Sequence, residues 1–143
     1  MKKLFICLAN SAKYKERCIA GIEVIRKPND KYSVVKKNPK QLQWLRPVTS
    51  AEYGQVSREL VEDIQLLDIC EIETIKNCPK GYQSENITFI PNSLKVYSKL
   101  TLKEKNLRHF IEPYLTLFGS NQRTVDLENI QNIQHSLQFI KAE

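Results

Sequence analysis

The chain has 143 residues, of which 41% are hydrophobic and 27% are charged, and its formal net charge is +6. These values are typical of one globular domain, or of one domain with an extension, and a chain of this size can bury a core without disulfides or metal ions. No segment approaches the roughly 20 consecutive apolar residues of a membrane-spanning helix, so we expect no membrane association.

The positive charge is concentrated near the N-terminus. Residues 1–40 hold 11 lysines and arginines against 3 acidic residues, whereas residues 41–143 hold 11 against 13. This asymmetry is compatible with a polyanionic partner. A lysine-rich, solvated surface explains the same pattern, so charge alone does not decide between the two.

The four cysteines give no sign of a metal site or of a disulfide framework. Cys7, Cys18, Cys70 and Cys78 include no pair with the spacing of zinc ligands, and both histidines are distant in the sequence. Cys7 and Cys70 lie inside apolar runs and are expected to be small core residues. Since the N-terminal apolar run is also shorter than that of a signal peptide, we expect a cytoplasmic protein with reduced thiols and no cofactor.

The first apolar run, Leu4 to Ala9, predicts a buried strand. The polar residues after it indicate a loop that offers an amide, a hydroxyl and several cations, and such loops often carry a ligand site. The candidate ligand residues of this loop are Asn10, Ser11, Lys15 and Arg17. The alternatives are a turn closed by Asn10 and Ser11 and simple solvation of the cations.

Further short strands and turns follow in chain order. Gly21 lies inside the second strand and indicates a bulge or a sharp bend. Pro47 should end its strand or place that strand at a sheet edge. A short helical turn is expected at 57–61, with Ser57 as its cap. The remaining strands are predicted at 18–25, 32–35, 42–48, 64–75, 82–90 and 93–100.

From Thr101 the apolar residues take helical spacing. The pattern predicts a helix over 101–118, with Thr101 and Glu104 as a capping box, a second helix over 126–134, and a short terminal strand at 137–140. We therefore predict a mainly β (α+β) fold, in which a small twisted barrel spans residues 1–98 and a helical extension or linker spans residues 99–143.

Polar residues inside apolar segments supply the other candidates. Arg46 needs a partner, which is an internal carboxylate, Glu85 or Asp68, or the phosphate of a ligand. Trp44 fits a base-stacking residue or a core residue. A segment that is otherwise strand-like contains Gln83, Glu85 and Asn86. Because a carboxylate repels phosphate, these three side chains favour recognition of a base or ribose, or positioning of the arginine.

Four sequence blocks in this order resemble the dual OB-fold domain proteins of bacteria. They are ICLANS-x5-RC-x-AG at 6–21, WLRPV at 44–48, LLDI-x-EI at 66–72 and QSEN at 83–86. The resemblance covers roughly the first 90–100 residues and implies an OB-like barrel, a cytoplasmic bacterial protein that binds nucleic acid or nucleotides beside defence systems, and no established catalysis. That family continues into a second barrel, so we expect either that this barrel is absent here or that the sequence is a fragment of a longer chain.

The leading hypothesis is a non-catalytic binding module for nucleic acid or a nucleotide. In this hypothesis one groove is lined by Asn10, Ser11, Lys15, Arg17, Arg46, Gln83, Glu85 and Asn86, with Trp44 available for stacking. The alternative is an interaction subunit that docks a partner protein through the barrel or through the predicted helix at 101–118. An enzyme that uses Cys18 or Glu85 is a third hypothesis.

Overall fold

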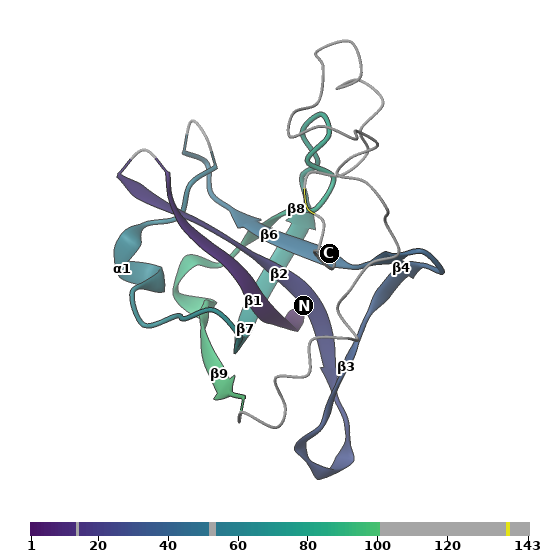
Figure 1. Cartoon of the computed structure of the whole chain (residues 1–143). Coiled ribbons are helices and arrows are strands. Elements are labelled where there is room, and N and C mark those ends of the chain that lie inside the picture. Colours follow the sequence, from purple (N-terminus) through teal and green to yellow (C-terminus); the bar gives the residue numbers. More distant parts are fainter. Residues whose placement is uncertain (14, 52–53, 101–136, 138–143) are drawn as a thin grey trace, which may run out of the picture.

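The computed structural model describes residues 1–13, 15–51, 54–100 and 137 (Figure 1). Within these ranges the structure is dominated by β-strands, with one short α-helix and two 3₁₀ turns. The strands are β1 (Lys2–Lys13), β2 (Glu16–Arg26), β3 (Tyr32–Val34), β4 (Lys36–Asn38), β5 (Gln41–Leu42), β6 (Trp44–Val48), β7 (Asp68–Asn77), β8 (Asn86–Phe89) and β9 (Lys95–Lys99). The helix is α1 (Arg58–Val61), and the 3₁₀ turns are η1 (Pro28–Asp30) and η2 (Pro91–Ser93).

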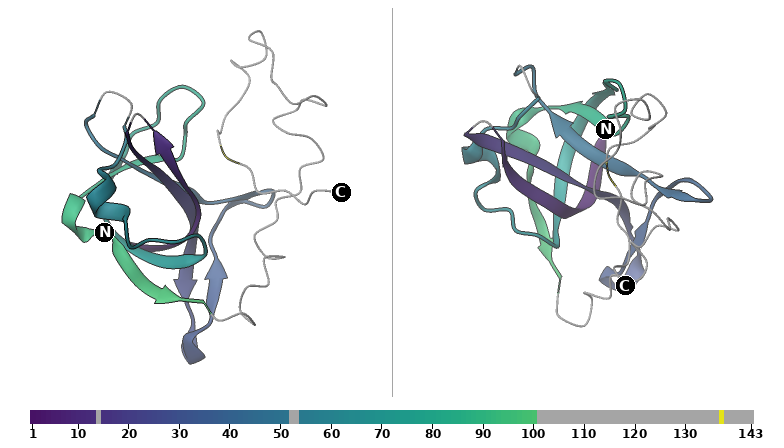
Figure 2. Two further views of the ribbon diagram at one scale, coloured as in Figure 1. Left: turned by 60° about the vertical axis from the view of Figure 1, so that its left-hand side comes forward. Right: turned by 45° about the horizontal axis from the view of Figure 1, so that its top comes forward.

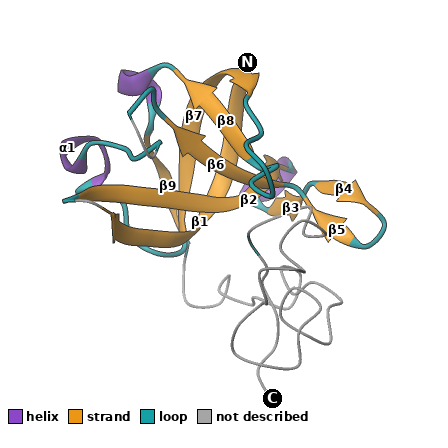
Figure 3. Ribbon diagram, turned by 90° about the horizontal axis from the view of Figure 1, so that it is seen from above, coloured by secondary structure: helices purple, strands orange, loops and turns teal. Residues whose placement is uncertain are grey.

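Five strands form a closed ring in the order β1-β2-β6-β8-β7, and β7 pairs back onto β1 (Figure 2). All neighbours in the ring are antiparallel except β6 and β8, which are parallel. The connection between β6 and β7 contains α1. A five-stranded ring with this order is an OB-like barrel, so the predicted mainly β fold is confirmed. β3 and β9 extend the sheet beyond the ring, whereas β4 and β5 form a separate hairpin (Figure 3).

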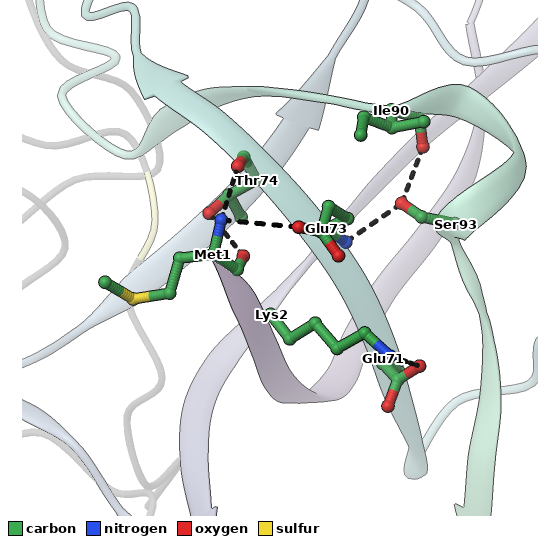
Figure 4. Close-up of polar contacts among 7 residues, drawn as sticks. All are labelled: Met1, Lys2, Glu71, Glu73, Thr74, Ile90 and Ser93. Atoms are coloured by element: carbon green, nitrogen blue, oxygen red, sulfur yellow. Dashed lines mark hydrogen bonds and ion pairs between the residues drawn. The ribbon is translucent and has the colours of Figure 1, made fainter.

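The ring is closed where the N-terminus meets β7 (Figure 4). The ammonium group of Met1 donates to the carbonyl of Thr74 at 2.9 Å and lies 3.7 Å from the Glu73 carboxylate. Thr74 donates to the Met1 carbonyl through both its backbone N–H and its hydroxyl, each at 2.9 Å. Ser93 accepts a hydrogen bond from the Glu73 N–H, which attaches η2 to the same strand. The first residue is therefore held in place by β7.

Two apolar layers lie on opposite faces of the first strands, as the alternation of side chains along a strand requires. Phe5 and Cys7 of β1 join residues from all the other ring strands in the barrel interior. Ile6, between them, belongs to a second buried layer that includes Ile22 of β2. Leu137 packs against this second layer, so it is covered in part by a residue that lies far away in the sequence.

One expectation is wrong: Asn10 and Ser11 do not lie in a loop. β1 continues to Lys13, and Asn10 and Ser11 pair with Ile19 and Cys18 of β2. The polar residues remain in the strand because cross-strand pairing satisfies their backbone groups and alternation gives their side chains different faces. Only the short turn around Lys15 connects β1 to β2.

Pro47 lies inside β6 and pairs with Ile87 of β8, so it neither ends the strand nor places it at an edge. β6 ends at Val48, as predicted, but it lies inside the ring between β2 and β8. Its ladder with β2 involves only Trp44 and Leu45, so the missing N–H of Pro47 falls beyond that ladder.

The start of β7 differs from the prediction because of a turn. β7 begins at Asp68 rather than at residue 64, since Leu67 adopts a positive φ of 72° and ends the preceding turn. Ser57 precedes α1 as predicted, although its side chain makes no capping hydrogen bond. The helices predicted at 101–118 and 126–134 lie outside the described residues.

Candidate functional site

An open cleft of about 470 Å³ lies where the start of β2, the end of β6, the segment after β6 and the β7–β8 connection meet. Its lining combines amides, a hydroxyl, a phenol, two thiols and two basic side chains. The lining residues are Cys18, Arg46, Val48, Thr49, Ala51, Gly54, Cys78, Lys80, Gly81, Tyr82, Gln83 and Asn86. Three of the predicted site residues, Arg46, Gln83 and Asn86, therefore share this cleft.

The register of three adjacent strands brings the central residues of the cleft together. Arg46 of β6 is the parallel partner of Asn86 of β8. The backbone N–H of Cys78, just after β7, donates to the Asn86 carbonyl at 2.9 Å. These three residues come from distant positions in the sequence but lie in one row across the sheet. All three line the cleft.

Arg46 forms an internal ion pair, which confirms one of the two predicted alternatives. Its guanidinium lies 3.0 Å from the Glu85 carboxylate, and the two side chains are only 10% and 3% exposed. The other candidate partner, Asp68, pairs instead with Lys99 at 3.2 Å. Because the Arg46 charge is compensated by a buried carboxylate, the pair adds little net charge to the cleft.

An amide pair lies beside this ion pair. The Asn86 Nδ2 donates to the Gln83 Oε1 at 3.2 Å. The Asn86 Oδ1 is buried and has no hydrogen-bond partner among the residues that the structure describes. Gln83 is held by two backbone hydrogen bonds with Lys80, and Gly81 inside this turn has a φ of +57°, which favours glycine. The cleft thus presents amide groups that can both donate and accept hydrogen bonds.

The other predicted residues do not line this cleft. Asn10 donates from Nδ2 to the Ile64 carbonyl at 2.9 Å and so faces the connection between α1 and β7. Arg17 neighbours Cys18 on β2, and successive side chains of a strand point to opposite faces, so the arginine points away from the cleft that Cys18 lines. Ser11 and Lys15 are exposed beside the β1–β2 turn. Ligand binding by these four residues stays a prediction.

Trp44 is a core residue. It is 7% exposed and belongs to the second apolar layer. Together with Lys37 and Glu85 it borders a separate hollow of about 20 Å³, which has room for about one water molecule. Stacking of a base on Trp44 stays a prediction and would require this buried ring to become more exposed.

Three lining residues that carry useful chemistry are not among the predicted groove residues. Lys80 is exposed in the turn after Cys78, Tyr82 is 42% exposed, and Thr49 follows β6. The Pro-Lys-Gly-Tyr segment at 79–82 is typical of a turn. It was the sequence signal that could have predicted an exposed cation at Lys80 and an exposed ring at Tyr82, near Gln83.

Cys78 is one of the two thiols that line the cleft. Burial raises the pKa of the Cys78 thiol above its ordinary value, so this group is largely protonated at neutral pH. Across residues 1–13, 15–51 and 54–100, no group of three or more His, Cys, Asp or Glu side chains could hold a metal ion. None of the helices in the described part of the chain is long and apolar enough to cross a membrane.

Comparison with known proteins gives one match. The model of a family described as a dual OB-containing domain matches residues 3–143. The matched region therefore extends beyond the four motif blocks and includes residues after 100. No curated protein and no solved structure shows significant similarity to the chain.

Proposed function

Because the chain belongs to the dual OB-containing domain family, we propose that it is a non-catalytic binding module that holds a nucleic-acid strand or a nucleotide in the cleft. The observation that carries this proposal is the position of the cleft on the barrel. The cleft lies on β2 and β6, the second and third ring strands in the sequence. It is bordered by the connection between β7 and β8, the last two ring strands in the sequence. This is the face on which OB folds bind oligonucleotides and oligosaccharides.

The chemistry of the lining favours a nucleotide over a sugar chain. Tyr82 offers an exposed ring on which a base can stack. The Gln83–Asn86 amide pair can hydrogen-bond to a base edge, as asparagine and glutamine side chains do with adenine. Lys80 supplies one cation for a phosphate.

The first prediction tests the cleft with a salt-titrated binding panel of nucleotides, single strands and duplexes. Tyr82→Ala should weaken binding of the preferred ligand about tenfold, since stacking on one aromatic ring contributes about 1–3 kcal/mol per base. Lys80→Ala should weaken it less and should lower the salt dependence by about one phosphate contact. Fluorescence anisotropy measures both effects.

Matched controls come from the other end of the sheet. Tyr97 on β9 is exposed to a similar extent, 38%, and Lys95 on the same strand is an exposed lysine. Tyr97→Ala and Lys95→Ala should leave affinity within about twofold of the parent. If the cleft variants and the control variants bind equally well, the cleft is not the ligand site.

Other parts of the initial hypothesis stay predictions. We expect the module to act in the bacterial cytoplasm beside a defence system, as the resemblance implied. Docking of a partner protein through residues 101–118 is the alternative, and that segment lies outside the described residues. Contacts from Asn10, Ser11, Lys15 or Arg17 would require the ligand to extend from the cleft toward the β1–β2 turn.

A further inference from the structure

The β4–β5 hairpin is basic and carries no compensating carboxylate. From Lys31 to Ala51 the sequence contains five basic residues and no acidic one. Three of them, Lys36, Lys37 and Lys40, are exposed on the hairpin, and none forms an ion pair within the described residues. The hairpin therefore has a local positive charge that no carboxylate of the described residues compensates.

Most lysines elsewhere on the sheet differ from those of the hairpin, although Lys76 on β7 also forms no ion pair with a described residue. Four of them form ion pairs across neighbouring strands: Lys2 and Lys95 with Glu71, Lys3 with Glu23, and Lys99 with Asp68. Each of these positive charges is partly compensated within the barrel. The contrast indicates that the hairpin lysines are not simply part of an evenly balanced surface.

The hairpin is also fixed in shape. Asn38 donates from Nδ2 to the Gln41 side chain at 2.7 Å, and its Oδ1 accepts from the Lys40 N–H at 2.9 Å. At the base, the Gln43 N–H donates to the Val35 carbonyl at 2.8 Å, next to the pairing with β2. The lysines are thus displayed on a preorganised turn, which lowers the entropic cost of binding an extended anion.

The hairpin and the cleft lie on two sides of the same short segment. Gln83 and Asn86 line the cleft, whereas Ser84 and Glu85 border the small hollow that Lys37 also lines. Figure 3 shows the hairpin projecting from the barrel at the edge of the molecule. A nucleic-acid strand that leaves the cleft across residues 83–86 would therefore reach the lysines of the β4–β5 hairpin.

We propose that the β4–β5 hairpin is a phosphate-contacting arm for a single nucleic-acid strand, one base of which occupies the cleft. This inference rests on the proposed function, and it assigns an oligonucleotide rather than a mononucleotide as the ligand. The Arg46 charge is compensated by Glu85, so the cleft has few cations with which to hold a phosphate backbone. The hairpin supplies them next to the cleft.

The second prediction compares a labelled single strand of about 10 nucleotides with its mononucleotide. The double variant Lys36→Ala/Lys40→Ala should weaken binding of the oligonucleotide about tenfold at low salt. It should also reduce the slope of log K against log salt by about 1.4, the value for two single-strand phosphate contacts. Binding of the mononucleotide should stay unchanged, because it does not reach the hairpin.

The control is Lys27→Ala/Lys31→Ala, which removes the same charge at exposed positions flanking η1. Its salt slope should remain that of the parent. The hairpin proposal is overturned if both double variants behave alike, or if polyglutamate competes as well as the oligonucleotide. If Tyr82→Ala weakens both ligands and the hairpin variant weakens neither, the cleft stands and the arm fails. If the parent binds neither ligand, both proposals are overturned.

Discussion

At the scale of single residues, the buried Arg46–Glu85 pair links folding to the cleft. Glu85 contacts Arg46 twice, because its carbonyl also accepts the Arg46 N–H at 2.9 Å while its carboxylate binds the guanidinium. Burying two charges is costly, and removing one partner leaves the other uncompensated in a low-dielectric environment. The pair is therefore expected to specify how β6 and the β7–β8 connection meet.

The third prediction concerns this pair. Glu85→Ala should lower the free energy of unfolding by about 3–5 kcal/mol, because it removes the buried carboxylate that pairs with the Arg46 guanidinium. The apolar double variant Arg46→Met/Glu85→Leu should recover most of that loss. Lys99→Ala is the comparison: it breaks the pair with Asp68, in which the lysine is 61% exposed, and should cost less than about 1 kcal/mol. Urea denaturation measures the free energy of unfolding of all three variants. Similar losses of stability in Glu85→Ala and Lys99→Ala would contradict the importance of the buried pair.

At the scale of elements, β1 and β2 approach each other closely at Gly21. This residue pairs with Cys7, and the register shifts at the next position, where β1 has one extra residue, Leu8. A Cβ atom on Gly21 would lie 1.9 Å from the Ile6 carbonyl oxygen and 2.7 Å from a ring carbon of Phe5. The bulge is thus on the strand opposite the glycine, and the glycine allows the two backbones to bend together.

The fourth prediction compares two glycines. Gly21→Ala should destabilise the protein by about 3 kcal/mol or more, since the clash involves backbone and cannot be relieved by a side-chain rotation. Gly81→Ala should cost only about 1 kcal/mol, because its φ is positive but no atom lies within 4 Å of the added Cβ. Thermal denaturation followed by circular dichroism measures the difference. A larger loss at Gly81 would mean that conformational strain outweighs the close approach.

At the scale of the whole molecule, closure of the ring separates two classes of thiol. Cys7 and Cys70 lie in the barrel interior at 0% exposure, whereas Cys18 and Cys78 line the open cleft. Burial raises the pKa of Cys7 to about 12 and shifts that of Cys70 in the same direction. At neutral pH the interior thiols are therefore protonated, and in the folded barrel they are shielded from reagents.

The fifth prediction follows the reactivity of these thiols. At about pH 8 a thiol reagent should modify Cys18 and Cys78 in the native protein, and Cys7 and Cys70 only after unfolding, as mass spectrometry of peptides will show.

A raised folded-state pKa also makes stability fall as pH rises. The stability that each protonated interior thiol contributes is complete at pH values below its ordinary pKa of 9.0. It is lost as the pH rises toward about 12, by about 1.4 kcal/mol per pH unit for each thiol. Cys7→Ala should reduce this slope, and rapid native modification of Cys7 would contradict a closed ring.

The sequence by itself determined the local features of this protein. The apolar run at 64–75 predicted the strand that became β7, and apolar neighbours predicted core positions for Cys7 and Cys70. The place of Arg46 in an apolar segment predicted its need for a partner. Periodicity and burial tendency are set by adjacent residues, so these features can be read without knowledge of the fold.

Only the tertiary structure decided which residues share a surface. The β6–β8 pairing brought Arg46 next to Asn86. The register of β1 and β2 turned Arg17 away from the cleft that its neighbour Cys18 lines. A shift of one residue in either ladder would exchange the two faces of a strand. Register depends on contacts between segments distant in the chain, and this is why the cleft, unlike its individual strands, could not be derived from local sequence patterns.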